Sequence, residues 1–130
     1  MASPISLSIW RDSVCAGDDC DAPHELKLGV RDDTLRDIVN ELLRKRYLAS
    51  IEGGRATWIL EANRPLAVLA QQWERPRFLV DAEAAVGKYI SHGQPPDLRL
   101  RYWCQADPDR VFECLRDGRA LPDRHQSSSA

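Results

Sequence analysis

Apolar residues recur at helical spacing between residues 32 and 48, and this is the most regular pattern in the chain. The apolar positions that would share one stripe of this helix are Leu35, Ile38, Val39, Leu42 and Leu43. Charged residues fill the opposite face, as in an amphipathic helix with one buried side. Asp33 or Thr34 can cap its first amides, and Asp37 completes a capping-box-like pair with Thr34.

Alternation of apolar and polar residues predicts strands on both sides of this helix. The predicted strands cover residues 5–10, 25–30, 57–61, 66–73, 98–104 and 110–115, with a short apolar run at 78–80. A short helix is the alternative over 66–73, because Leu66, Leu69, Ala70 and Trp73 also fit one helical face. Asp81 can cap a second, short helix over 82–90.

The last two predicted strands are separated by the turn-forming sequence ADPD, which predicts a terminal hairpin. In that hairpin Cys104 and Cys114 would face each other across the strands. A reducing compartment would keep them as thiols.

The order of elements is strand, strand, helix, strand, strand, helix, strand, strand. It predicts an α+β fold with a mixed or mainly antiparallel sheet of about six strands, the long helix on one face and a second, short helix. The first half resembles the ubiquitin-like β-grasp arrangement in element order, and that resemblance implies no function. We expect one domain over residues 1–117 and a flexible polar tail over 118–130.

The length of 130 residues suits a single domain, and the net charge of −2 arises from 18 basic and 20 acidic residues. This balance gives no general reason to bind nucleic acid or an anionic membrane. The first residues do not resemble a secretory signal, and the longest apolar run, Leu66–Ala70, is far too short for a membrane span. We therefore expect a cytoplasmic protein with reduced cysteines.

No histidine lies at a known catalytic spacing from a serine or cysteine, and no glycine-rich phosphate loop is present. The sequence therefore predicts a protein that is not an enzyme and has no cofactor. Cys15, Cys20 and His24 are weak candidates for a metal site. Their spacing is loose, and zinc requires four such ligands, so we predict no metal site.

The candidates for partner binding are aromatic and charged. By alternation Trp10 points away from the apolar side of its strand, and Trp103 shares a face with Arg99 and Arg101. Tryptophan and arginine often anchor protein interfaces. Burial of both rings under the second helix, or against each other, is the alternative. The acidic loop contributes further candidates, Asp12, Asp18, Asp19 and Asp21.

These features favour a non-enzymatic domain that binds another protein, without nucleic acid or membrane partners. In size, acidity and lack of catalytic motifs the chain resembles bacterial immunity proteins, which neutralise one toxin by blocking its active site. That resemblance implies that the acidic loop enters a basic toxin cleft while Trp10 or Trp103 anchors the complex. Two alternatives remain open: a small metal-binding domain or enzyme that uses Cys15, Cys20 and His24, and a self-associating scaffold subunit.

Overall fold

A computed structural model describes residues 5–11, 25–30, 33–45, 56–62, 64–90, 97–103 and 106–122. In chain order the elements are β1 (Ile5–Arg11), β2 (Glu25–Val30), α1 (Leu35–Arg44), β3 (Thr57–Glu61), β4 (Pro65–Ala70), β5 (Arg77–Phe78), a 3-10 helix (Val86–Tyr89), β6 (Asp97–Tyr102) and α2 (Pro108–Asp117). None of the helices in this described part combines the length and the apolar character needed to cross a membrane.

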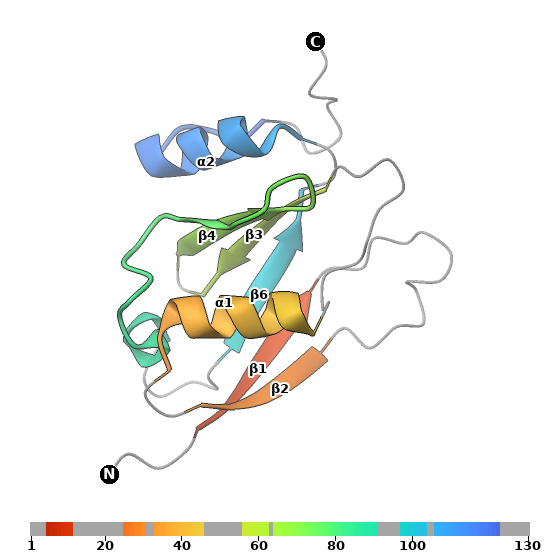
Figure 1. The fold of residues 1–130 in the computed structure, drawn as a ribbon. Coiled ribbons are helices and arrows are strands. Elements are labelled where there is room, and N and C mark those ends of the chain that lie inside the picture. The colour runs from red at the N-terminus through yellow and green to blue at the C-terminus, as the bar shows by residue number, and fades with distance from the viewer. Residues whose placement is uncertain are drawn as a thin grey trace.

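The strands form one mixed sheet in the order β2-β1-β6-β3-β4-β5 (Figure 1). β1 and β6 are parallel, and the other neighbouring pairs are antiparallel. The predicted α+β class with a mixed six-stranded sheet is therefore confirmed. The order β1, β2, α1, β3, β4, on which the likeness to the β-grasp arrangement depends, is present in the structure.

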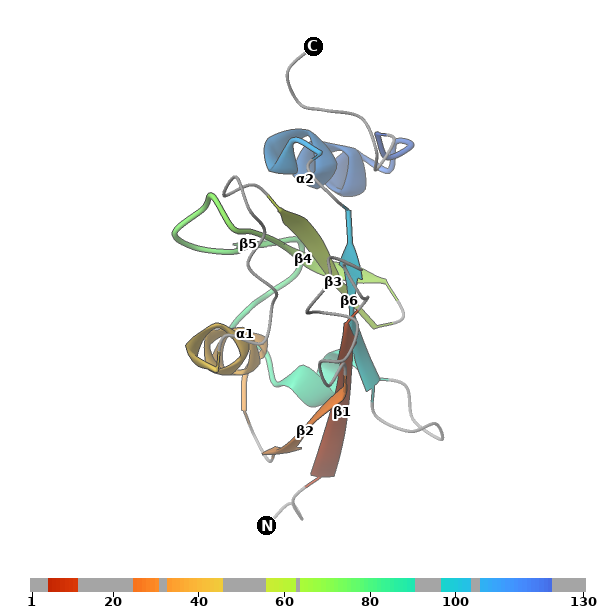
Figure 2. The ribbon, with the colours of Figure 1, turned by 90° about the vertical axis from the view of Figure 1, so that its right-hand side faces the viewer.

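Helix α1 lies on one face of the sheet, as Figure 2 shows with the sheet seen nearly edge-on. The predicted capping box is confirmed, because the Asp37 amide donates to the Thr34 hydroxyl and the Thr34 amide donates to the Asp37 carboxylate, each at 3.1 Å. Four of the five predicted stripe residues are buried, namely Leu35, Ile38, Val39 and Leu42. Leu43 is 40% exposed, so the buried stripe is narrower than predicted.

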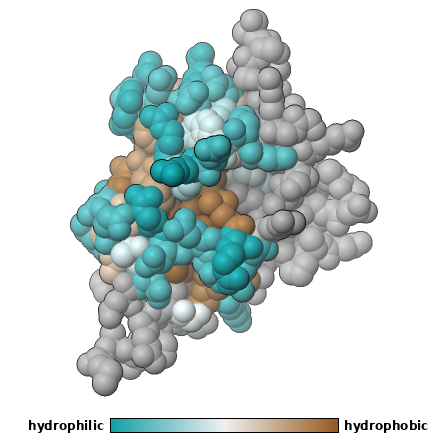
Figure 3. Space-filling view, viewed as in Figure 1, coloured by the Kyte–Doolittle hydropathy of each residue, from teal (hydrophilic) through white to brown (hydrophobic). Residues whose placement is uncertain are grey.

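The main core fills the space between α1 and the sheet. Strands β1, β6 and β3 contribute the inward residues Leu7, Ile9, Leu98, Leu100, Trp58 and Leu60. The Trp58 ring is 1% exposed, and its centroid lies 4.8 Å from that of Tyr102. On this side of the molecule hydrophilic residues cover both helices, and hydrophobic residues show between them (Figure 3).

Residues 108–117 form helix α2, so the predicted strand over 110–115 and the terminal hairpin are wrong. The Asp107 side chain caps the helix by accepting from the Asp109 amide at 3.1 Å, and Pro108 occupies its first turn. Gly118 ends it in the left-handed conformation, at φ 70°. Cys114 is a buried free thiol on this helix and has no place in a hairpin, while Cys104 lies outside the described residues.

The predicted helix over 82–90 is reduced to the single 3-10 turn at Val86–Tyr89. The reason is its contact with the start of α1. The carbonyls of Ala82 and Ala84 accept hydrogen bonds from the Arg36 and Leu35 amides, at 2.9 and 3.1 Å, and are therefore not available for a helix of their own. Asp81 caps no helix, because residues 82–85 are not helical; its carboxylate still accepts from the Glu83 amide two residues on.

The segment predicted as a strand over 66–73 forms β4, which ends at Ala70. The prediction of a strand is confirmed, and the alternative of a short helix is wrong. The apolar run predicted at 78–80 corresponds to the two-residue strand β5, Arg77–Phe78, at the edge of the sheet.

Candidate functional site

The sheet face opposite α1 is divided into a covered half and an open half. Ile59 of β3 and Val68 of β4 are buried beneath Val111 and Phe112 of α2. Helix α2 lies beside β4. On this face no helix of the described part covers the strands β2, β1 and β6, whose other face packs against α1. The open half therefore results from the position of α2 at one side of the sheet.

We call this open half the open sheet face and define it by the residues Ser8, Trp10, Lys27, Glu61, Arg99 and Arg101. Trp10 is opposite Arg99 in the parallel pairing of β1 and β6. Arg99 is in turn opposite Glu61 in the antiparallel pairing of β6 and β3. An indole ring, a guanidinium and a carboxylate thus form a row across three neighbouring strands.

Trp10 is 40% exposed, which is high for a side chain of its size. Its predicted direction, away from the apolar side of β1, is confirmed, because Leu7 and Ile9 are fully buried on the other face. Beside the ring lies a shallow hollow of about 260 Å³, lined by Trp10, Glu61, Ala62, Leu98 and Arg99. The ring offers apolar area to another molecule, and the hollow beside it is lined by charged as well as apolar residues.

The open sheet face carries charges of both signs. Lys27, Arg99, Arg101 and Glu61 lie on it, and the pairing of β1 with its two neighbours adds Glu25 opposite Trp10 and Asp97 opposite Ser8. The Arg101 Nη1 atom lies 3.6 Å from a carboxylate oxygen of Glu61, and Lys27 and Arg99 are exposed. Sequence reasoning did not select Lys27 or Glu61. Their role depends on which strands become neighbours, and alternation within one strand carries no such information.

Trp103 directly follows β6 and is only half-exposed. Its indole Nε1 donates to the Pro122 carbonyl at 2.9 Å, and the ring, like Leu121, packs against the cluster under α2. The Arg101 guanidinium carbon lies 5.1 Å from the ring centroid. Trp103 therefore holds the segment after α2 against the sheet, and Trp10 is the more exposed of the two rings.

The remaining predicted site residues fall outside the described residues. They are Asp12, Cys15, Asp18, Asp19, Cys20, Asp21 and His24. Within the described ranges, no group of three or more histidine, cysteine, aspartate or glutamate side chains is placed to hold a metal ion.

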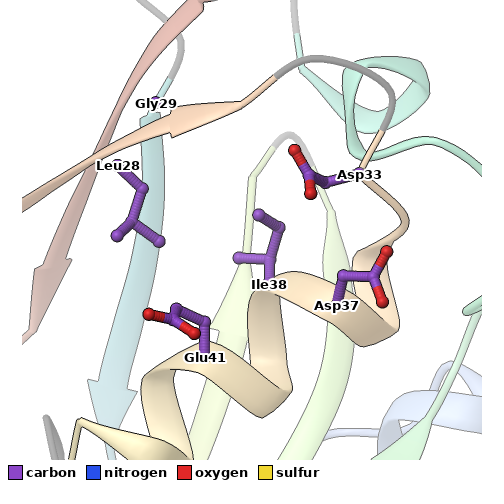
Figure 4. Close-up of a pocket in the computed structure, with 6 residues that line it drawn as sticks. All are labelled: Leu28, Gly29, Asp33, Asp37, Ile38 and Glu41. Carbon is purple, nitrogen blue, oxygen red and sulfur yellow. The ribbon is translucent and has the colours of Figure 1, made fainter.

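A second concave surface lies between β2 and α1. This β2–α1 groove has a volume of about 540 Å³ and is lined by Leu28, Gly29, Asp33, Asp37, Ile38 and Glu41 (Figure 4). The sequence did not predict this groove, because the groove depends on how far α1 lies from β2, and local sequence patterns do not contain that distance. Two of its acidic members, Asp33 and Asp37, were interpreted as helix caps.

Glu41 lies at one end of this groove and is bonded to the last turn of α1. Arg44 Nε donates to the carboxylate at 3.0 Å, and Lys45 Nζ lies 3.7 Å away. The hydrogen bond from Arg44 lowers the pKa of Glu41, and the charges of Arg44 and Lys45 act in the same direction.

We expect the Arg44→Ala variant to raise the pKa of Glu41 towards its ordinary value. A carboxyl group with a lowered pKa in the folded state stabilises the fold above its unfolded-state pKa, and this contribution disappears as the pH falls through the folded-state pKa. The variant should therefore lose the small part of the acid dependence of stability that this pair supplies. Carbon-detected NMR titration of the Glu41 carboxyl measures the shift. An unchanged midpoint would show that the bond to Arg44 is not maintained in solution.

The described site residues offer groups for recognition: apolar ring area at Trp10, donors at the arginines and a shallow hollow between them. Neither surface presents a nucleophile held next to a base among the residues named above. Comparison of the chain with protein-family models, with curated proteins and with solved structures found no match.

Proposed function

We propose that this protein is a non-enzymatic domain that binds another protein through its open sheet face, with Trp10 as the anchor. The observation that supports this most directly is the incomplete cover by α2, which leaves Trp10 40% exposed beside a hollow. Tryptophan and arginine are enriched among the side chains that contribute most to binding, and such anchors lie near the centre of an interface. Trp10 lies next to Arg99, near the C-terminal end of β1, which is the middle one of the three open strands.

The residues of this face indicate how a partner would be held. Trp10 offers apolar ring area, and Arg99 beside it can bind a carboxylate or carbonyl group of the partner. Arg101 lies 3.6 Å from a Glu61 oxygen, whereas Arg99 is exposed and is the residue directly opposite Trp10 on the neighbouring strand. Arg99 is therefore the cation closest to the proposed anchor.

In its narrower form the proposal is a bacterial immunity protein that acts in the cytoplasm and blocks the active site of one toxin. The support for this form is that the acidic loop directly follows the strand that carries Trp10 in the sequence. Asp12 directly follows β1, the strand that carries Trp10, and Asp18, Asp19 and Asp21 belong to the same acidic loop. A basic cleft could then contact the acidic loop while Trp10 packs beside it, and opposite charges would speed association.

The test is a pull-down from the native host under reducing conditions with the tagged full chain and two charge-reversal variants. Arg99→Glu changes the open sheet face, and Arg75→Glu reverses an exposed charge in the turn after β4. We expect one dominant, near-stoichiometric partner with the wild-type chain and with Arg75→Glu, and a clear loss of that partner with Arg99→Glu.

The identity of the partner separates the two forms of the proposal. A nuclease or another toxin whose activity falls on binding supports the immunity function, and a partner of another kind supports the general form alone. Recovery of the bait alone, or equal recovery with both variants, would contradict the open sheet face as the interface. Zinc analysis of the Cys20→Ser variant and sedimentation at several concentrations would then test the metal-binding and self-associating alternatives.

A further inference from the structure

Arg99 and Arg101 lie on the same face of β6 but have different surroundings. The Arg101 guanidinium carbon lies 5.1 Å from the Trp103 ring centroid, and its Nη1 atom lies 3.6 Å from a Glu61 carboxylate oxygen. The Arg99 guanidinium is exposed and makes no ion pair with any residue that the structure describes. One arginine is therefore engaged inside the protein, and the other is available to another molecule.

The register of the strands does not by itself produce this difference. Glu61 of β3 lies directly opposite Arg99, and Arg101 is only its diagonal neighbour, opposite Ile59. Side chains directly opposite each other on one face of an antiparallel pair are the closest neighbours, and opposite charges at such positions attract. Glu61 thus has two arginines within reach and is in contact with the diagonal one.

The contacts of Arg101 explain why Glu61 turns to it. The Trp103 ring beside Arg101 is itself held by the bond from its Nε1 to the Pro122 carbonyl at 2.9 Å. A guanidinium near an aromatic ring gains cation–π attraction, and a side chain that is already ordered loses less entropy when it forms an ion pair. The Glu61 side chain is only 22% exposed, so this contact is partly shielded from water. Arg101 is therefore the preferred neighbour of Glu61.

The same choice determines what the open sheet face presents beside its anchor. Trp10, Arg99 and Glu61 all line the hollow of about 260 Å³. A guanidinium binds a carboxylate through two parallel N–H donors, so a carboxylate of the protein's own chain would occupy the donors that another molecule needs. With Glu61 turned to Arg101, the Arg99 donors next to Trp10 stay available.

We propose that Arg101 is a positioning residue of the open sheet face: it holds Glu61 and thereby keeps Arg99 available for a carboxylate of the partner. In its absence Glu61 would turn to the directly opposite Arg99 and compete with the partner's carboxylate. This inference rests on the proposed function, since it assumes that the partner binds at Trp10 and Arg99. The choice of Glu61 between two arginines is a property of the free protein, however, and can be measured without a partner.

The first measurement uses the free full chain and follows the exchange of arginine Nε protons with water by nitrogen-15 NMR. Arg99→Lys assigns the Arg99 signal by its loss, and Arg75, exposed in the turn after β4, is the reference. We expect Arg99 to exchange as fast as Arg75 in the wild-type chain and about threefold more slowly in Arg101→Ala, because a hydrogen-bonded proton is protected. The double variant Arg101→Ala/Glu61→Gln should return the exchange rate to the wild-type value.

The second measurement is the affinity for the partner recovered through the open sheet face. Arg101→Ala should raise Kd about threefold to fivefold, because the competing surface ion pair is only modestly favourable. Arg101→Lys should keep most of the affinity, since a lysine can still hold Glu61. The double variant Arg101→Ala/Glu61→Gln should restore the affinity, because no carboxylate of the chain is then left to compete for Arg99.

Arg77→Ala is the matched control for this affinity. Arg77 also lies near a carboxylate and a ring, with its Nη1 atom 3.3 Å from Asp109 and its guanidinium carbon 4.0 Å from the Phe112 ring centroid. These two neighbours belong to α2, at the covered half of the sheet face. We expect Arg77→Ala to leave Kd within about twofold of the wild-type value, and thermal unfolding checks that each variant is folded.

Slow exchange of Arg99 in the wild-type chain, or an unchanged rate in Arg101→Ala, would overturn the proposal whether or not a partner is found. A loss of affinity in Arg101→Ala that the double variant does not restore would show that Arg101 contacts the partner itself, and it would also overturn the proposal. A partner that still binds Arg99→Glu would contradict the proposed function instead. The exchange rates of the free protein would even then show which arginine holds Glu61, so the two failures are distinguishable.

Discussion

Replacing Trp58 by alanine is expected to destabilise the fold by about 3–5 kcal/mol, the largest effect of any substitution considered for this protein. Trp58 is 1% exposed and belongs to the central strand β3, so its ring contacts the core between α1 and the sheet. Its ring also packs against Tyr102 of the neighbouring strand, with centroids 4.8 Å apart. The substitution would leave a large cavity in the only layer that joins α1 to the described sheet. Urea denaturation followed by circular dichroism measures the loss.

Trp10→Ala is the matched control, because it removes the same side chain from the opposite face of the same sheet. Trp10 is 40% exposed, and we expect its removal to cost less than about 1 kcal/mol of stability. If both substitutions cost the same, the assignment of Trp58 to the core and of Trp10 to the surface is wrong.

The second large effect concerns binding. Against the partner recovered through the open sheet face, Trp10→Ala should raise Kd by about 30-fold or more, which corresponds to about 2 kcal/mol of binding free energy. The physical reason is that a partly exposed indole has apolar area still to bury, and Arg99 on the next strand limits where a partner can dock. Isothermal titration calorimetry with the purified partner measures the change, and the folded state of the variant is checked by its thermal unfolding.

Leu43→Ala supplies the control for this measurement. Leu43 is also a large apolar residue at 40% exposure, but it lies on α1, on the other side of the sheet. We expect the affinity for this partner to stay within about twofold of the wild-type value. Equal losses for the two variants would indicate a general effect of surface hydrophobicity, and a loss with Leu43→Ala alone would move the interface to the helix side.

Local sequence patterns correctly predicted those elements in which apolar spacing, capping residues and charge placement all indicate the same structure. In α1 the apolar spacing, the Thr34 cap and the charged outer face all indicate a helix, and the structure contains one. The alternating strands β1 and β2 were predicted for the same reason, because one buried face imposes a period of two. Strand β3 was also predicted, although it is buried on both faces.

Two elements were predicted wrongly, one because a local signal had two meanings and the other because contacts with a distant segment overrode the local signal. The sequence ADPD indicates a turn, but an aspartate followed by proline is also a helix start, and α2 begins there. Val111, Cys114 and Leu115 fit a helical face as well as they fit a strand. In the segment 82–90 the helical signal was overridden by backbone bonds to the first turn of α1, which no local pattern contains.

The sequence by itself determined the α+β class, the residues that form α1 and the face of β1 on which Trp10 lies, because these follow from short-range periodicity. Only the tertiary structure decided that β6 inserts between β1 and β3 and brings Trp10, Arg99 and Glu61 into one row. It also decided that α2 covers one half of the second face and that a groove opens beside the edge of β2. The physical reason is that strand order and helix docking depend on contacts between residues far apart in the chain, and periodicity within one segment carries no information about its neighbours.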